Sequence, residues 1–219
     1  MSGFLSSSIA RKVAMALSAL FLIFFLIMHL AVNLTSIFSE TLFNDLAHFM
    51  GTNPLIQFVM QPILIFGVIF HFVMGFVLEL KNKKATSVKY AKDNGAANST
   101  WMSRNMIYSG LVILAFIVLH FIDFWFPEIN HKYIAVLPED PTRYFHELQA
   151  KFVNPLRVAT YVVSFVLLGL HLAHGFQSAF QSMGFNNKYT KTVKAAGKIY
   201  SIVIPAGFII VAVFHYLNH

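Results

Sequence analysis

Four histidines lie deep inside long apolar stretches of the sequence, one in each stretch: His29, His71, His120 and His171. An imidazole in hydrocarbon raises the free energy of the folded chain unless a partner satisfies it. Ionisable residues inside membrane helices are therefore rare and mark functional sites. Imidazole can bind a metal or carry a proton, so these positions are the first candidates for chemistry. A hydrogen-bonded packing role is the alternative for any one of them.

The stretches that hold these histidines are long enough to cross a bilayer, which takes about 20 residues. The chain is 57% hydrophobic and 11% charged, whereas soluble domains are about 25% charged. Five segments are predicted to span the membrane: about 13–36, 55–78, 105–126, 156–180 and 199–217. We therefore predict an all-α integral membrane bundle in one domain over residues 1–219, with the first segment kept as a permanent helix.

The net charge of +7 is distributed unevenly along the chain. Lysine and arginine gather before the first segment and in the 81–104 and 181–198 loops, whereas the other two loops are neutral or acidic. The positive-inside rule then predicts a cytoplasmic N-terminus and a C-terminus outside, so the basic residues imply no nucleic-acid partner. Docking of a cytoplasmic protein is a second use for them. The chain has no cysteine, which excludes thiolate-bound iron–sulfur clusters and disulfides within it.

Depth sorts the four histidines into two pairs. His29 and His120 each lie seven residues before the expected outer end of a helix, which is about 10 Å. His71 and His171 each lie ten residues before an expected inner end, which is about 15 Å. Facing imidazoles at equal depth on different helices suit bis-histidine haem. Zinc is a weaker match because it takes three or four converging ligands.

His174 competes with His171 for the inner position. Two histidines three residues apart on one helix point the same way and cannot bind both faces of a haem. His71 and His171 are each followed four residues later by a glycine, Gly75 and Gly175, which would let a porphyrin lie against the helix. Close helix packing is the other use for such glycines. His174 is then expected to lie beside the site or to make a hydrogen bond.

Five motifs occur in a specific order: SSSIARKVAMALSALFLIFFLIMHLAVNL at 6–34, LFNDLAHFMG at 42–51, HFVMG at 71–75, WMSRNMIYSG at 101–110 and HLAHG at 171–175. Together they resemble the membrane cytochrome b subunit of bacterial succinate dehydrogenases and fumarate reductases. The likeness is to the branch with one five-helix subunit and two haems b, of the Bacteroidetes type. It covers nearly the whole chain.

The resemblance implies a function and a ligand set. His71 and His171 would ligate the inner haem, and His29 and His120 the outer haem, the pairing that depth gives independently. The subunit would anchor a flavoprotein and an iron–sulfur protein at the cytoplasmic face of the bacterial inner membrane. Electrons would pass between succinate, a substrate of the tricarboxylic acid cycle, and a quinone, here menaquinone. The succinate chemistry would take place in the partner subunits.

Further residues are candidates for quinone and propionate contacts. Asn44, Asp45 and His48 could bond a quinone near the outer haem, with an exposed loop histidine as the alternative. Trp101 and Arg104 could hold propionates of the inner haem through charge-assisted bonds. Their alternative is an interfacial anchor and a topology charge.

The sequence also suggests roles for four other positions, which bear on proton transfer, helix ends and a rival haem ligand. The fumarate reductase branch has a proton-transferring glutamate two residues before the ligand in the fourth helix, and Gly169 takes that position here. Glu79 and Asp123 are expected to be boundary or capping residues. His215 is the main rival for an outer ligand, although an interfacial position near the C-terminus is favoured.

Three other functions fit parts of the pattern. A cytochrome b subunit of a hydrogenase or formate dehydrogenase would keep the haems but change the partner. A haem-free transporter would use the histidines as a proton relay, and a structural anchor would only pack them. The matched depths and the paired HxxxG motifs favour a dihaem electron-transfer subunit.

Overall fold

Five long apolar helices dominate the structure, a computed structural model that describes residues 7–85, 106–185 and 187–219. The helices able to cross a membrane by length and composition are Ser8–Phe38, Ile56–Lys81, Met106–Ile134, Pro155–Ser182 and Thr190–Leu217. The described chain is all-α, so the predicted fold class and the five predicted spans are confirmed. Most of the helices begin earlier or end later than the apolar stretches suggested. The orientation of the termini stays a prediction.

Shorter helical segments accompany the five spans. In chain order the helices are α1 (Ser8–Phe38), α2 (Glu40–Thr52), α3 (Gln61–Ala85), α6 (Met106–His120), α7 (Phe126–Ile129), α8 (Arg143–Lys151), α9 (Pro155–Ser182) and α10 (Thr190–Leu217). Three π-helical segments, Ile56–Met60, Phe121–Trp125 and Asn130–Ile134, extend α3 and α6 at one end. Asn154 caps α9 by accepting hydrogen bonds from the backbone N–H groups of Leu156 and Arg157.

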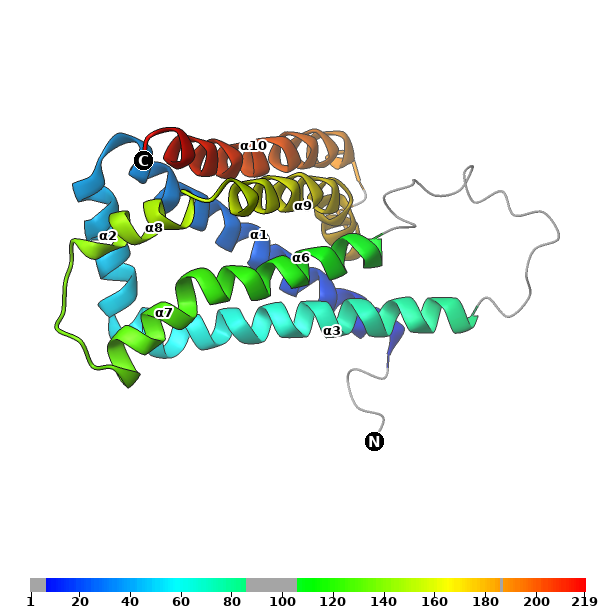
Figure 1. Ribbon diagram of the computed structural model, residues 1–219. Helices are drawn as coiled ribbons and strands as arrows, with labels where there is room; N and C mark the ends of the chain where they lie inside the picture. Colours follow the sequence, from blue (N-terminus) through cyan, green and yellow to red (C-terminus); the bar gives the residue numbers. More distant parts are fainter. Residues whose placement is uncertain (1–6, 86–105, 186) are drawn as a thin grey trace.

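Four spans form a ring in which each packs on two neighbours. Contacts join α1 to α3, α3 to α6, α6 to α9, and α9 back to α1. Helix α10 lies outside this ring, against α9 and α1 (Figure 1). In such a ring α1 and α6 face each other across the centre, and so do α3 and α9. The four candidate histidines are distributed one to each of these helices.

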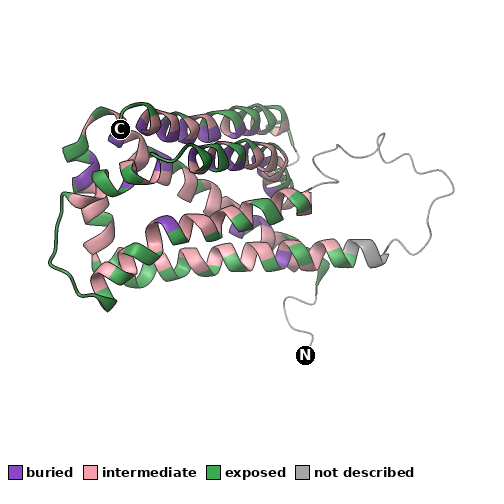
Figure 2. Cartoon of the chain, in the orientation of Figure 1, coloured by how far each residue is buried: buried purple, intermediate pink, exposed green. Residues whose placement is uncertain are grey.

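The densest packing lies between α1, α9 and α10. Tyr161, Phe165 and Phe208 belong to one buried aromatic and aliphatic cluster there, with Leu30 from α1. Figure 2 shows buried residues along α9 and α10, whereas α3 and α6 are mostly exposed or intermediate. The exposed side chains on those helices are largely apolar, as expected where lipid replaces water as the solvent.

Two amphipathic helices that were not predicted from the sequence, α2 and α8, cover one end of the bundle. Asn44 on α2 accepts a hydrogen bond from the backbone N–H of Phe145 on α8, with N and Oδ1 2.8 Å apart. The segment 42–51, expected to be a loop, is therefore a helix. Short polar helices carry too few apolar residues to give a strong periodic signal.

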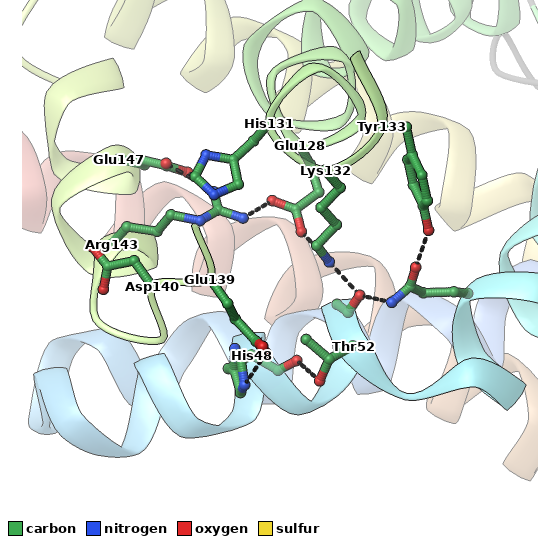
Figure 3. A network of polar contacts seen from close by, with 12 residues as sticks. His48, Thr52, Glu128, His131, Lys132, Tyr133, Glu139, Asp140, Arg143 and Glu147 are labelled. Carbon is green, nitrogen blue, oxygen red and sulfur yellow. Dashed lines mark hydrogen bonds and ion pairs between the residues drawn. The ribbon is translucent and has the colours of Figure 1, made fainter. Parts of the chain in front are cut away.

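A polar network joins this end of the bundle together (Figure 3). Glu128 forms ion pairs with Lys132 and Arg143, and the Lys132 ammonium donates to the Gly51 carbonyl oxygen. Burial lowers the pKa of Arg143, but the hydrogen bonds that its guanidinium donates to Glu128 and Glu147 outweigh it, so the pKa is raised overall. A Cβ at Gly51 would come within 3.0 Å of the Lys132 ammonium nitrogen, so glycine leaves that carbonyl accessible.

Candidate functional site

Each inner histidine is held by a serine from the neighbouring helix. Ser18 Oγ on α1 lies 3.1 Å from Nδ1 of His71 on α3. Ser109 Oγ on α6 lies 3.0 Å from Nδ1 of His171 on α9. The inner pair, His71 and His171, therefore has the same hydrogen-bond arrangement on both sides.

The serine hydroxyls decide which ring nitrogen carries the proton. Ser18 donates its only hydroxyl hydrogen to the Met15 carbonyl oxygen at 2.8 Å, and Ser109 donates to that of Met106 at 2.9 Å. Each hydroxyl can then only accept from the histidine, so Nδ1 carries the hydrogen. The lone pair is left on Nε2. Metal-binding histidines are oriented in the same way, with the second ring N–H donated to a fixed acceptor.

The same methionines also face the glycines of the HxxxG motifs. A Cβ at Gly75 would lie 3.5 Å from the Met15 methyl carbon, and one at Gly175 would lie 3.3 Å from that of Met106. These neighbours are the ends of flexible side chains and not backbone. Neither glycine is therefore required for the helices to approach as closely as they do, which weakens the packing alternative.

The contacts repeat because a sequence pattern repeats. Helices α1 and α6 both carry methionine, then serine three residues later, then histidine eleven residues after the serine. Met15, Ser18 and His29 correspond in this way to Met106, Ser109 and His120. The two serines were not predicted as site residues, although their spacing is visible in the sequence. A serine in a membrane helix is common, and only its contact with a histidine reveals its role.

The outer pair, His29 and His120, meets across the ring. The two imidazole centroids are 5.7 Å apart with their planes nearly perpendicular, at 87°. Each lies eleven residues beyond a serine of the inner level, which places the two levels about 16 Å apart along the helices. Their ring contacts are aromatic: Phe25 stacks on His29 at 5.2 Å, and Phe124 lies 5.1 Å from His120.

A buried acid lies one helical turn beyond the outer pair. Asp123 is 3% exposed, forms an ion pair with Arg157, and accepts a hydrogen bond from the Tyr161 hydroxyl at 2.7 Å. The Tyr161 ring is 6.4 Å from that of His120. The expectation of a boundary or capping role for Asp123 was wrong, because two residues of α9 turn an exposed-looking acid into a buried ion pair. Asp123 sits in the π-helical segment Phe121–Trp125, a distortion that is frequent at functional sites.

The packing of α9 on α10 leaves room only for a small residue at position 169. Pro205 has no N–H to donate to the Ser201 carbonyl, and a Cβ at Gly169 would lie 3.0 Å from that carbonyl oxygen. Helices α9 and α10 are therefore too close at this level for a larger side chain. The proton route of the fumarate reductase branch has no counterpart at Gly169.

The predicted quinone residues do not converge on one surface. Asn44 is buried and bonded to α8, Asp45 is exposed, and His48 lies 3.1 Å from Glu139. Each thus has a structural partner or faces solvent, and their quinone role stays a prediction. Trp101 and Arg104 lie outside the described residues.

His215 is more buried than the sequence suggested. It is 0% exposed, and its Nε2 lies 2.8 Å from the Ser36 hydroxyl on α1. His215 lies in the last turn of α10, at the end of the span as expected, but it is shielded by protein because α1, α8 and α10 pack together there. His215 is also separate from the outer pair, since it lies seven residues beyond Phe208, the α10 residue that touches His29 at 5.5 Å.

The described residues offer pairs of ligands and not clusters. In residues 7–85, 106–185 and 187–219 no group of three histidine, cysteine or acidic side chains converges on one point. Two facing imidazoles fit the two axial positions of a haem iron.

No family model, curated protein or solved structure matches this chain.

Proposed function

We propose that this multi-pass membrane protein is a dihaem cytochrome b, and that it is the membrane-anchor subunit of a succinate:quinone oxidoreductase. The single observation that supports it most is the pair of serine–histidine contacts at the inner level. Each contact leaves the Nε2 lone pair of its histidine available. A haem bound between two imidazoles supplies one-electron redox chemistry in the middle of the membrane.

The residues of this chain have separate roles in the proposal. His71 and His171 are the proposed ligands of the inner haem, and His29 and His120 are those of the outer haem. Ser18 and Ser109 fix the ring orientation and the tautomer of the inner ligands. Gly75 and Gly175 leave space beside the inner ligands.

The proposed partners follow from the resemblance and from the chain's charge. A flavoprotein and an iron–sulfur protein would dock on the lysine-rich face, the end of the bundle nearest the inner pair. Menaquinone is the proposed lipid-soluble electron carrier. The absence of cysteine from the chain means that flavin and iron–sulfur chemistry would belong to the partners.

A spectrum of the purified full chain tests this proposal. The chain is expressed with added haem precursor, and the dithionite-reduced spectrum is compared with the oxidised one. We expect b-type absorption bands and about two haems per chain in a pyridine haemochrome assay. A well-folded, haem-supplied chain without haem would overturn the proposal and favour the transporter.

A further inference from the structure

Three lysines lie on one exposed face at the start of α10. Lys191, Lys194 and Lys198 are spaced by three and four residues, which places them on the same side of a helix, and all three are exposed. We call these three residues the lysine face. Lys188 comes just before the helix, and its ammonium nitrogen lies 5.1 Å from the centre of the Tyr189 ring. None of these residues takes part in the proposed haem ligation.

The helices around the lysine face supply no carboxylate to pair with it. Helix α10 packs on α9 and α1. The first acidic residue of the chain is Glu40 and the last is Glu147, so α1, α9 and α10 contain no acid. Like charges three or four residues apart on a helix repel one another. An anion from outside the bundle would relieve this repulsion.

The same side of α10 becomes apolar one turn beyond Lys198. Ile202 follows Lys198 by four residues and is 59% exposed, and Ile199 is 63% exposed. Exposed apolar side chains here mark the level at which the span enters the hydrocarbon of the bilayer. The exposed Tyr189 lies on the other side of the lysines, as aromatic residues do at membrane interfaces. An anion that meets the lysine face therefore has an apolar surface directly beside it.

The turn before α10 fixes the lysine face beside the end of α9. Gly184 has a φ of +88°, a conformation that glycine adopts readily. The backbone N–H of Phe185 donates to the Phe180 carbonyl oxygen at 3.0 Å, and that of Gly184 donates to the Gln181 carbonyl oxygen at 3.1 Å, a pattern that ends helices. Helix α10 itself lies outside the four-helix ring (Figure 1). The exposed lysines are therefore at the edge of the bundle, where lipid surrounds it.

We propose that the lysine face binds the headgroup of an anionic phospholipid. The phosphate pairs with the lysine ammonium groups, and an acyl chain lies along Ile202. Lysine clusters at the end of a membrane span attract anionic lipids, and a long lysine side chain can reach toward the headgroups. This site goes beyond the proposed haem function and does not depend on it. It holds one lipid of the surrounding bilayer in preference to its neutral neighbours.

The experiment compares two lipids for retention by the full chain. The chain is equilibrated in mixed micelles with equal amounts of phosphatidylglycerol, which is anionic, and phosphatidylcholine, which is neutral overall. Native mass spectrometry counts each lipid on the purified chain. We expect one phosphatidylglycerol per chain, with a preference of about tenfold over phosphatidylcholine. The preference should fall as salt is added, because the lysines are exposed.

A triple variant removes the charges of the lysine face. Lys191→Gln, Lys194→Gln and Lys198→Gln together should abolish the preference, whereas arginine at the same three positions should keep it. The matched control is the triple variant Lys12→Gln, Lys81→Gln and Lys151→Gln, which lowers the net charge by the same amount and should retain the lipid. Circular dichroism and the haem count should be the same in all of these chains, since the substituted lysines do not support the fold.

A second arm distinguishes the lipid from free phosphate. Glycerol 3-phosphate, which has the phosphate without the acyl chains, should not displace the bound phosphatidylglycerol even in large excess. Displacement would overturn the assignment to a lipid.

The remaining outcomes also decide the matter. An unchanged chain without preference for phosphatidylglycerol would overturn the site. Equal preference in the unchanged chain and the lysine-face triple variant would overturn it too, and would leave docking of a cytoplasmic protein as the role of these lysines. Equal loss in both glutamine triple variants would show an effect of net charge alone, which the proposal excludes.

Discussion

The two histidine pairs occupy the same ring of helices but are stabilised by different interactions. The inner pair, His71 and His171, is held by hydrogen bonds that the Nδ1–H groups donate to Ser18 and Ser109. The outer pair is packed among aromatic side chains, and Nδ1 of His120 is buried without a hydrogen-bond partner in the described residues. A hydrogen bond fixes a tautomer, whereas aromatic packing fixes only the ring position.

This difference indicates how the two sites would differ in properties. Donation of the Nδ1 hydrogen makes the opposite nitrogen a stronger ligand. Under the proposed function, the inner histidines would therefore be oriented for the haem iron before it binds. The outer histidines would rely on packing and on the nearby ion pair of Asp123 and Arg157. We expect the inner haem to bind more tightly than the outer haem.

The largest effect should come from removing a ligand. His71→Ala or His171→Ala should remove the inner haem, because one axial imidazole alone holds haem poorly. For the same reason, His29→Ala or His120→Ala should remove the outer haem. The pyridine haemochrome count should fall from about two to about one per chain in each case. His174→Ala is the control and should keep both. Loss of a haem in His174→Ala with retention in His171→Ala would reverse the assignment.

Substitution of Ser18 or Ser109 should distinguish haem binding at the inner pair from haem binding at the outer pair most clearly. Ser18→Ala and Ser109→Ala should each weaken haem binding at the inner pair by about 10–100-fold and leave the outer pair unchanged. Haem transfer to apomyoglobin, followed by absorbance, measures the affinity. Ser164→Ala is the matched control, since Ser164 is buried in α9 but donates to the Thr160 carbonyl. Equal loss in Ser164→Ala would show a general packing defect.

Asp123→Ala should affect the outer end selectively. It removes the acceptor of Tyr161 and leaves the Arg157 guanidinium unpaired, which lowers the free energy of unfolding by about 3 kcal/mol. Thermal unfolding followed by circular dichroism should show a lower midpoint. The exposed Asp45→Ala should leave the midpoint unchanged. If Asp123→Ala and Asp45→Ala had the same unfolding midpoint, the ion pair would not stabilise the outer end of the bundle.

Alanine at Gly75 should give the smallest effect on the fold. Its Cβ would make ordinary contact with the Met15 methyl group, and alanine favours a helix over glycine by about 1 kcal/mol. The haem-free chain should therefore melt no lower than the unchanged chain. If glycine leaves room for a porphyrin, haem binding at the inner pair should nevertheless weaken. Unchanged haem affinity would leave Gly75 as a packing residue.

The five spans could be predicted from the sequence because lipid leaves a helix as the simplest arrangement for a long apolar stretch. The pairing of His29 with His120 followed from depth alone, since each helix advances by a fixed rise per residue. The short helices α2 and α8 could not be predicted in the same way. They carry polar faces, and their position depends on contacts such as that between Asn44 and Phe145.

The residues that were misjudged share one cause. Asp123 and His215 lie near the ends of spans, where an acid or a histidine is expected to face water. Their partners, Arg157 and Tyr161 in one case and Ser36 in the other, lie 34 to 179 residues away in the sequence. Such partners cannot be recognised from the sequence, because they meet only when the segment Phe121–Trp125 packs on α9 and when α1 packs on α10.

Each histidine pair takes one member from the first half of the chain and one from the second. During synthesis, α1 and α3 leave the ribosome with Ser18 and His71 complete, long before α6 and α9 exist. The outer pair can close only after translation has passed His120, and the inner pair only after it has passed His171. Under the proposed function, haem could bind to both pairs only late in the synthesis of the chain. A chain whose fourth span failed to enter the bilayer would still retain the facing pair His29 and His120, so partial loading would report which insertion step had failed.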